Sequence, residues 1–494
     1  MMSNEPFAQS PVPFSPRSYQ LTAIRFLLEH ANAGLFLKPG LGKTSTTLAA
    51  ITFLKKRKMI RGKILIIAPV RVCYSVWPRE IHKWADFGHL TYEILHGPDK
   101  DQALKRKADI YLINPEGIDW LLGTVYDRSF GAKKPKVTVD AERFEKLGFS
   151  MLVVDELAKY KAHDTNRFKA MRPILHTFDQ RWGLTGSPAA NGLLGLWGQC
   201  FVLDMGGALG PYVTHYRNQY FIPDVYGHSW KLQHDGAERI YERLAPLVLQ
   251  MDDDLLDMPA LSLNDIRVQL PADAMRVYRA LEKDMITAIQ DNLVTAATAA
   301  AASMKLRQIA SGGIYLDAEI LASGLRLPKS ERKWANLHTV KVEALQDLVE
   351  ELQGQPLLVA YDFEHDVDRL RTAFPKAIFA CDFSAKQFDK VERDWNAGKI
   401  ELLFGHPQSI GHGLNLQDEG RDVCFHSQIW DFDLYDQFIR RVYRQGNKHR
   451  KVTVHRIIAE DTVDELICGA LAFKDRTQQA VFDGLKKLAS ERGR

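Results

Sequence analysis

Cysteine is scarce in this chain, and its spacing argues against two common kinds of scaffold. The five cysteines are an odd total without a Cys-x-x-Cys pair, and they lie far apart, at Cys73, Cys200, Cys381, Cys424 and Cys468. A zinc ribbon needs paired cysteines, and a disulfide framework needs an even set. We therefore expect neither.

The chain also lacks a long apolar segment and a large excess of charge of one sign. No apolar run reaches the roughly 20 residues of a membrane span. The N-terminal Met-Met-Ser-Asn-Glu-Pro has no charged-then-apolar signal layout, so we expect a cytoplasmic protein without a membrane partner. With 65 basic and 61 acidic residues the net charge is only +4, so a nucleic-acid surface would have to be a local groove.

Length and hydrophobic pattern indicate an α/β protein with more than one lobe. The 494 residues are too many for a single hydrophobic core. Solid apolar runs, typical of buried parallel strands, occur at Ile64–Ala68 and Met151–Val154. A second α/β stretch starts near Leu357–Ala360, continues through Glu401–Phe404 and includes Val423–Phe425. Residues 195–338 look helical, with few strand signals. We expect the lobes to meet near the acidic segment Met251–Pro259.

A glycine-rich turn, Lys-Pro-Gly-Leu-Gly-Lys-Thr, lies near the N-terminus. Glycines let backbone amides approach a polyphosphate, and a following lysine and hydroxyl supply charge and a magnesium ligand. We expect Gly40 and Gly42 to cradle the phosphates of ATP, Lys43 to neutralise them and Thr44 to bind Mg²⁺. An ordinary glycine turn that caps a helix is the alternative.

An acidic pair follows the apolar run at Met151–Val154. Asp155 is placed to hold the magnesium ion, and Glu156 to orient or deprotonate the attacking water. The alternative is a carboxylate pair that caps the next helix. Because the glycine turn and the acidic pair occur together and in order, the sequence favours an ATP-hydrolysing enzyme.

A third group of polar residues lies near the C-terminus. Gln437, Arg441 and Arg444 are spaced i, i+4 and i+7, which predicts one helix face that carries all three side chains. Such a face could reach a phosphate held elsewhere in the protein. A solvated basic helix surface is the alternative.

Several motifs taken together resemble helicase superfamily 2. Gly183-Leu-Thr-Gly-Ser-Pro188 resembles motif III of that superfamily, and Asn191–Trp197, Phe201–Gly206 and Leu306–Ile309 resemble its Swi/Snf-type branch. The likeness covers nearly the whole chain and is greatest to compact phage- or bacteria-encoded members. It implies an α/β fold of two tandem RecA-like parallel-sheet lobes with helical insertions between them, in the cytoplasm of a bacterium or a phage-infected host.

The resemblance implies a division of the chain. Lobe 1 would span 1–250 with a first helical protrusion at about 195–250. Lobe 2 would span 251–475 with a second helical protrusion at about 262–335 and a core at about 336–475. A basic helical tail would follow at 476–494.

The resemblance also implies roles for single residues in the nucleotide site. Gln20 resembles the glutamine that reads adenine, and Gly413 and Gln437 fall in motifs V and VI as nucleotide contacts. Arg441 and Arg444 would be finger contacts to the γ-phosphate, which would tie closure of the lobes to chemistry.

A second implied set lines the track of the DNA backbone. It comprises Pro69, Arg71, Asn114, Thr185, Ser187, Tyr361, His412 and Asn415. Backbone contacts from amides, hydroxyls and basic side chains suit a motor that grips without reading sequence. Each polar member could instead be an ordinary surface or core group. His406, His412 and His426 lack metal-ligand spacing, and we interpret them as core or groove histidines.

The implied function is a DNA-dependent ATPase that uses ATP and Mg²⁺ to move along double-stranded DNA and remodel DNA or protein–DNA complexes. One departure concerns coupling, because Ala158 stands where the family has a histidine or aspartate that ties hydrolysis to motif III. Two alternatives stay open: a strand-separating helicase of superfamily 2 on DNA or RNA, and a nucleic-acid-binding scaffold with static ATP. Glu156, Arg441 and Arg444 argue against the scaffold.

Overall fold

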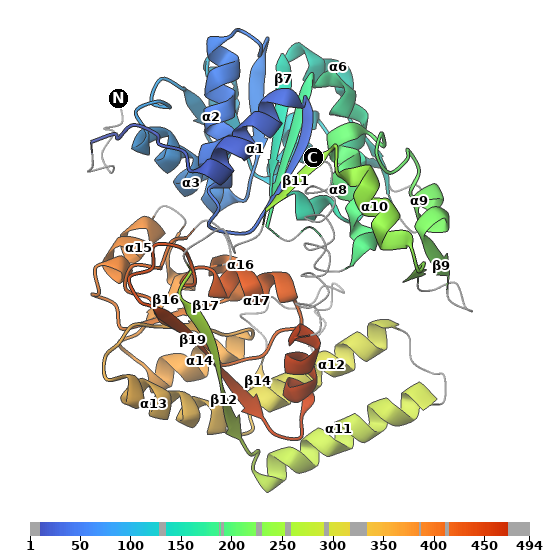
Figure 1. Ribbon diagram of the computed structural model, residues 1–494. Helices are drawn as coiled ribbons and strands as arrows, with labels where there is room; N and C mark the ends of the chain where they lie inside the picture. Colours follow the sequence, from blue (N-terminus) through green and yellow to red (C-terminus); the bar gives the residue numbers. More distant parts are fainter. Residues whose placement is uncertain are drawn as a thin grey trace. The chain divides into compact units, whose positions relative to one another are not determined.

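The computed structural model of the protein describes residues 10–127, 135–186, 188, 192–223, 230–251, 258–290, 296–316, 333–384, 387–410 and 414–472, without the side chains of 284–290 and 296–302. These residues form two compact units, one that ends at Met251 and one that begins at Met258 (Figure 1). Each unit is built on its own parallel sheet. The two sheets confirm the predicted α/β class with two lobes.

The sheet of the first unit has seven strands, and every neighbouring pair in it is parallel. In spatial order the strands are β11 (Val248–Met251), β1 (Asn32–Leu37), β8 (Gln180–Thr185), β7 (Phe149–Asp155), β2 (Lys63–Ile67), β4 (Ile110–Ile113) and β3 (Tyr92–Ile94). The central strands are buried on both faces, which is why they read as unbroken apolar runs.

Helices cover both faces of this sheet (Figure 1). One face carries α1 (Ser18–Glu29), α2 (Lys43–Lys56) and α3 (Val70–Lys83). The other carries α6 (Ala141–Lys146), α8 (Leu196–Asp204) and α10 (Gly236–Leu244). Four further α-helices belong to this unit: α4 (Lys100–Lys105), α5 (Ile118–Leu122), α7 (Asn166–Met171) and α9 (Val213–Tyr220). Two short antiparallel pairs join β5 (Val125–Asp127) to β6 (Lys136–Thr138) and β9 (Phe221–Pro223) to β10 (Trp230–Leu232).

The sheet of the second unit has six strands, again in parallel pairs. Their spatial order is β12 (Ala260–Val268), β19 (Lys451–Ala459), β18 (Asp422–Phe425), β15 (Leu357–Ala360), β17 (Leu402–Gly405) and β16 (Ile378–Phe379). A hydrophobic core on one face packs α13 (Val340–Leu352) and α14 (Glu364–Ala373) against these strands.

Strand β12 corrects the expected extent of the second protrusion. The sequence assigned residues from about 262 to a helical protrusion, whereas Ala260–Val268 is an edge strand of the sheet. Its residues are half-buried or exposed, so no apolar run marks it. Its register with β19 joins Ala260 to Lys451, a pairing that local sequence does not reveal. Likewise β9, β10 and β11 lie in a stretch that was expected to hold few strands.

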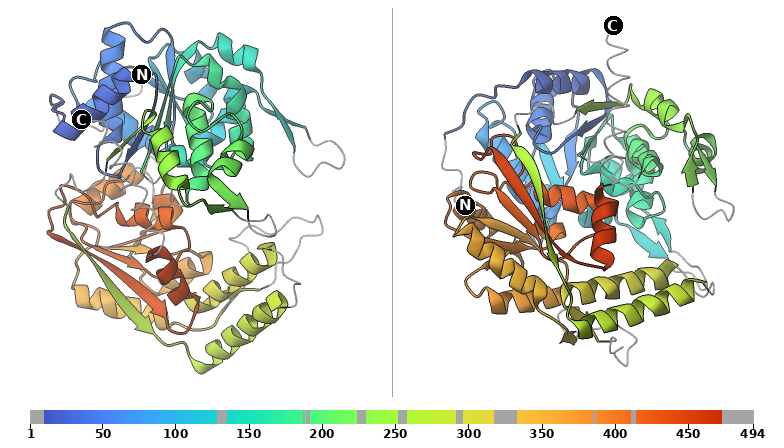
Figure 2. Two further views of the ribbon diagram at one scale, coloured as in Figure 1. Left: turned by 45° about the vertical axis from the view of Figure 1, so that its right-hand side comes forward. Right: turned by 60° about the horizontal axis from the view of Figure 1, so that its bottom comes forward.

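Two long helices form the helical insertion of the second unit. Helices α11 (Ala272–Gln290) and α12 (Ala296–Ser311) lie side by side, as Figure 2 shows from two directions. The antiparallel pair β13 (Gly313–Tyr315) and β14 (Trp334–Asn336) follows.

The other helical segments complete the second unit. They are α15 (Phe388–Asn396), α16 (Pro407–Ile410), α17 (Phe432–Ile439) and a last helix at 463–472. Lys341 on α13 forms a fully buried ion pair with Asp464 on that last helix. The tail predicted at 476–494 lies outside the described residues. Of the helices that the structure describes, none is long and apolar enough to cross a membrane.

Candidate active site

The candidate residues of the first unit gather at one edge of its sheet. Parallel strands share the edge at which their carboxyl ends meet, and ligands of open α/β sheets bind there. The register places Thr185 beside Phe36, and Asp155 beside Leu184. The glycine turn after β1, the acidic pair after β7 and the turn after β8 are therefore neighbours.

The glycine turn forms a cradle at the amino end of α2. Gly40 and Gly42 have φ angles of +96° and +71°, in the left-handed region that favours glycine. Helix α2 begins at Lys43, so the amides of its first turn point toward the loop with the positive end of the helix dipole behind them. This backbone geometry suits both a helix cap and a phosphate cradle, because both use the free amides at the start of the helix.

Gln20 lies directly against this cradle. The residue sits on α1, is buried, and accepts a hydrogen bond from the Arg17 amide at its Oε1, 3.0 Å away. A Cβ atom added to Gly42 would lie only 2.5 Å from the Nε2 of Gln20. The fold brings together residues that are 22 positions apart, as an adenine-reading role for Gln20 would require; that role stays a prediction.

The lysine and the motif III turn close the cradle. Lys43 Nζ folds back over the loop and donates to the carbonyl oxygens of Leu37 and Lys38, at 2.7 and 3.4 Å. Thr44 follows it in the first turn of α2. A Cβ at Gly186 would lie 3.0 Å from Cδ of Pro39, so the turn after the fully buried Thr185 touches the phosphate loop.

Asp155 and Glu156 stand at the end of β7. Burial raises the pKa of the Asp155 carboxyl, while the indole N–H of Trp77, 3.0 Å from Oδ2, and the charge of Lys43 favour its ionised form. Glu156 has a φ of +71°, a conformation that costs a residue with a side chain roughly 1–3 kcal/mol. Within the described residues its side chain makes no capping hydrogen bond, so the capping alternative fails for Glu156.

The candidate DNA contacts of the first unit differ in accessibility. Pro69 is the residue before the first turn of α3 and is buried, and Arg71 in that turn is half-buried. Asn114 is also buried, and its Nδ2 donates to Oε2 of Glu116 at 2.8 Å. Ser187 lies outside the described residues.

The arginine motif in the second unit does not have the predicted helical geometry. Helix α17 ends at Ile439, so Gln437 is helical, whereas Arg441 follows in a turn and Arg444 in irregular backbone. The Arg441 Nε atom donates to the Gln437 carbonyl, the acceptor that the backbone amide of residue 441 would use in a continuing α-helix. That amide bonds instead to Phe438, three residues back, which tightens the turn and ends the helix.

A shared carbonyl, rather than helical spacing, brings the two arginines together. Arg441 and Arg444 both donate to the carbonyl of Leu414, at 3.1 and 3.3 Å. Two amide oxygens of this region, Asn415 Oδ1 and Gln437 Oε1, are buried without a hydrogen-bond partner among the described residues. His412 and Gly413 lie outside the described residues.

Most side chains near the carboxyl end of β15 are buried or held by neighbouring side chains. Tyr361 is buried, and burial together with a hydrogen bond to the Cys381 side chain raises its pKa. His406 Nε2 lies 3.2 Å from Oδ1 of Asp362. His426 is fully buried, which lowers its pKa to about 3. Among the described residues, no three or more His, Cys, Asp or Glu side chains lie together in a way that could hold a metal ion.

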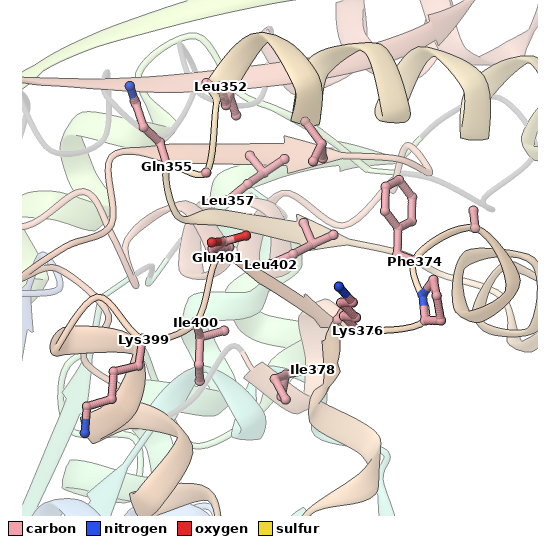
Figure 3. A pocket seen from close by; sticks show the side chains of 15 residues that line it. Leu352, Gln355, Leu357, Phe374, Lys376, Ile378, Lys399, Ile400, Glu401 and Leu402 are labelled. Carbon is pink, nitrogen blue, oxygen red and sulfur yellow. The ribbon is translucent and has the colours of Figure 1, made fainter.

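A cavity of about 550 Å³ in the second unit lies apart from these residues (Figure 3). Its walls include Leu357, Phe374, Lys376 and Glu401, at the amino ends of β15 and β17. Ligands of parallel sheets bind at the opposite, carboxyl edge. The cavity therefore plays no part in the candidate site.

The first unit has the donor set that ATP and magnesium need. Four features fit a magnesium-bound triphosphate. They are a glycine turn too tight for a Cβ at Gly42, the side chain of Lys43 over that turn, Thr44 in the first turn of α2, and the buried carboxylate of Asp155 at the end of β7. Sequence reasoning missed Trp77, because only the fold brings it to Asp155. The site defines a nucleotide-hydrolysing enzyme of the phosphate-loop class.

Comparison with known proteins identifies the family. The model of the SNF2-related domain matches residues 19–312, and the chain belongs to the SNF2-related family. This places it among the ATPases of helicase superfamily 2, as the sequence predicts. Protein p41 of Acyrthosiphon pisum secondary endosymbiont phage 1 is 33% identical over 96% of this chain and 99% of its own length.

Two further comparisons are more distant. The ISWI chromatin-remodeling complex ATPase ISW2 of Saccharomyces cerevisiae is 23% identical over 94% of this chain, which spans only 40% of that relative. The SWI2/SNF2 ATPase core of Sulfolobus solfataricus, solved in complex with double-stranded DNA, has a TM-score of 0.41 and 20% identity over 98% of this chain and 96% of that one.

Proposed function

We propose that the protein hydrolyses ATP in response to double-stranded DNA and moves along the duplex, remodelling DNA or displacing bound protein. The observation that carries this proposal is the meeting of the phosphate loop, Asp155 with Glu156, and the Thr185 turn at one sheet edge of an SNF2-related chain. ISW2 is named as the ATPase of a remodelling complex. This chain spans two fifths of it, so we extend only the motor to this protein. A cytoplasmic location stays a prediction.

In the ATP site, Gly40, Gly42 and the first amides of α2 would hold the phosphates. Thr44 and Asp155 would hold magnesium, which when bound neutralises charge on the phosphates. Lys43 would exchange its two carbonyl partners for phosphate oxygens. Glu156 would orient the attacking water and accept its proton.

Arg441 and Arg444 would supply positive charge from the second lobe. When the lobes close, they would leave the Leu414 carbonyl and meet the γ-phosphate, with Gly413 and Gln437 as further nucleotide contacts. Charge that arrives only on closure stabilises the transition state and not the open state, so hydrolysis would be tied to movement. Such an arginine contributes roughly 10³–10⁵ in rate in other phosphate-loop enzymes.

DNA would be gripped through its backbone. Arg71, Ser187, His412 and Asn415 would offer cationic or polar side chains, and Thr185, which is fully buried in this structure, would have to be exposed first. Asn114 and Tyr361 are held by neighbours in this structure, so binding would have to release them. Pro69 would act only by starting α3. Because the contacts are to phosphates, affinity should fall steeply with salt and vary little with base sequence.

Steady-state ATP hydrolysis with no nucleic acid, blunt duplex DNA, single-stranded DNA and RNA tests the proposal. We expect strong stimulation by blunt duplex that is abolished in Lys43→Ala and Arg444→Ala. Arg444→Ala should retain ATP binding, because its role is in the transition state. Lys448→Ala is a matched control: this nearby lysine is exposed and paired with Glu419, so its loss should leave turnover unchanged.

The other outcomes separate the remaining candidates. Stimulation by single strands or RNA alone, with strand displacement on a tailed duplex, would replace the translocase with an unwinding helicase. Absence of hydrolysis under every condition, with ATP binding intact, would leave a static ATP-binding scaffold and refute the motor.

A further inference from the structure

A hydrogen bond joins the Asp155 carboxylate, the proposed magnesium ligand, to a helix from elsewhere in the first unit. The indole Nε1–H of Trp77 donates to Oδ2 of Asp155 at 3.0 Å, across 78 positions of sequence. Trp77 has no exposed surface. A buried indole N–H costs free energy unless it finds an acceptor, and a carboxylate is a strong one. The bond therefore fixes both groups, and it turns Oδ2 toward α3.

One face of helix α3 is turned toward Asp155. Cys73 and Trp77 are four residues apart and so share a helix face. Burial and then the charge of Asp155 raise the pKa of the Cys73 thiol, as expected of a group on the face that meets the carboxylate. The strand before this helix, β2, pairs directly with β7, in register Ile67 to Val154. Helix α3 therefore begins next to the strand end that carries Asp155.

A different side of the same helix carries a proposed DNA contact. Arg71 precedes Trp77 by six residues, which places its side chain about 120° around the helix axis at 100° per residue. It lies in the first turn, at the carboxyl edge of the sheet. A rigid helix that touches DNA at its first turn and Asp155 two turns later can transmit a small movement between them.

The helix also has a point at which it can bend. Pro78 lies inside α3, directly after Trp77. Proline has no backbone N–H, so the bond to the carbonyl of Tyr74 is missing, and helices kink at such positions. The first two turns, including Arg71 and Trp77, can therefore tilt without moving the rest of the helix. Ala158, which is close to the acidic pair in sequence, has only a methyl side chain and so cannot make the polar contact by which a histidine or aspartate would tie hydrolysis to motif III.

We propose that Trp77 is a positioning residue that holds the Asp155 carboxylate for magnesium and makes α3 the link between the DNA backbone and the ATP site. The inference rests on the proposed function, because it assigns DNA to the first turn of α3 and magnesium to Asp155. Partners that orient a metal ligand typically alter metal affinity roughly 10–100-fold when removed. Loss of the indole N–H should therefore weaken the affinity for Mg²⁺ more than the affinity for ATP itself.

The test compares Trp77→Phe with Trp197→Phe in the full chain. Phenylalanine keeps an aromatic ring but lacks the N–H. Trp197 is a second buried tryptophan of the same unit, and its indole donates to the Gly210 carbonyl at 2.9 Å, an acceptor outside the candidate site. Binding of a ribose-labelled ATP is followed by fluorescence anisotropy over a Mg²⁺ titration, and ATP hydrolysis is measured with and without blunt duplex. Urea unfolding reports on stability.

We expect Trp77→Phe to bind labelled ATP like the wild type without Mg²⁺, to need roughly 10–100-fold more Mg²⁺ for the magnesium-dependent gain, and to lose stimulation by DNA. Trp197→Phe should change none of these. A Mg²⁺ titration that matches the wild type would overturn the positioning role, even if stability falls. A shifted titration with full DNA stimulation would overturn the link through α3.

Two further arms keep the result interpretable. If Trp77→Phe does not fold, 3-benzothienylalanine at position 77 keeps the shape of tryptophan and replaces the N–H by sulfur, with the same expected shift. If the wild type hydrolyses ATP without any response to DNA, the proposed function fails. The Mg²⁺ titration of nucleotide binding then still decides whether Trp77 positions Asp155.

Discussion

Replacing Gly42 by alanine perturbs the phosphate loop at its tightest point. Two costs arise. The first is conformational, because φ is +71° and a residue with a Cβ loses roughly 1–2 kcal/mol in the left-handed region. The second is steric: the new Cβ would lie 2.5 Å from Gln20 Nε2, so the loop or Gln20 must retreat by about 1 Å to reach ordinary contact.

The steric cost should lower kcat/KM, and the conformational cost should lower the free energy of unfolding. A displacement of about 1 Å in a group that positions substrate can lower the rate roughly 100-fold. Gly97→Ala separates the two terms, since Gly97 has a similar φ of +79° and its Cβ would meet no atom within 4 Å. Both variants should lose a similar free energy of unfolding. We expect only Gly42→Ala to lose kcat/KM, by about two orders of magnitude.

The assay combines urea unfolding with DNA-stimulated ATP hydrolysis for both variants. A Gly42→Ala protein with kcat/KM within a factor of two of Gly97→Ala would refute the reasoning, because it would mean that the contact with Gln20 does not constrain the loop. Adding Gln20→Ala to Gly42→Ala removes the clash. The double variant should therefore lose less ATP affinity than the product of the fold-losses measured in Gly42→Ala and Gln20→Ala.

Two further predictions concern the stability of the second unit. Lys341→Ala leaves the buried carboxylate of Asp464 without its cation and should lower the free energy of unfolding by roughly 3–5 kcal/mol. Lys448→Ala, in an exposed pair, should leave the urea midpoint almost unchanged, and equal losses for the two variants would contradict this. Burial lowers the pKa of His338 to about 4 and of His426 to about 3, so both stay neutral when folded while the unfolded chain takes up protons below about 6.5. Stability should therefore fall between pH 6.5 and 4, by roughly 1 kcal/mol per pH unit for each histidine, and a flat urea midpoint across that range would disprove it.

The parts of the fold that the sequence predicts well are those with local signals. Strand β7 is an unbroken apolar run that ends in Asp155, and burial on both sheet faces produces such a run wherever the strand lies. The Gly40–Thr44 turn carries its own backbone requirement, since Gly40 and Gly42 both have positive φ angles, at which glycine is the favoured residue.

Predictions failed where the outcome depends on distant partners. Strand β12 has no apolar run and exists because β19, nearly 200 positions later, supplies its hydrogen bonds. The spacing of Gln437, Arg441 and Arg444 suited a helix, yet helix α17 ends at Ile439, and Arg441 Nε bonds to the Gln437 carbonyl that a continuing helix would use. In each case a nonlocal bond or a side-chain bond outweighed the local pattern.

The sequence by itself determined the chemistry of this protein: a phosphate loop, an acidic pair and an arginine motif in an order that indicates an ATP-driven motor of the SNF2-related family. The tertiary structure alone decided which groups meet, namely Gln20 with Gly42, the two arginines on the Leu414 carbonyl, and the Asp155 carboxylate with Trp77. The physical reason is that reactive groups are set by residue type, which is local. Their orientation is set by hydrogen bonds and packing between segments that only the folded chain brings together.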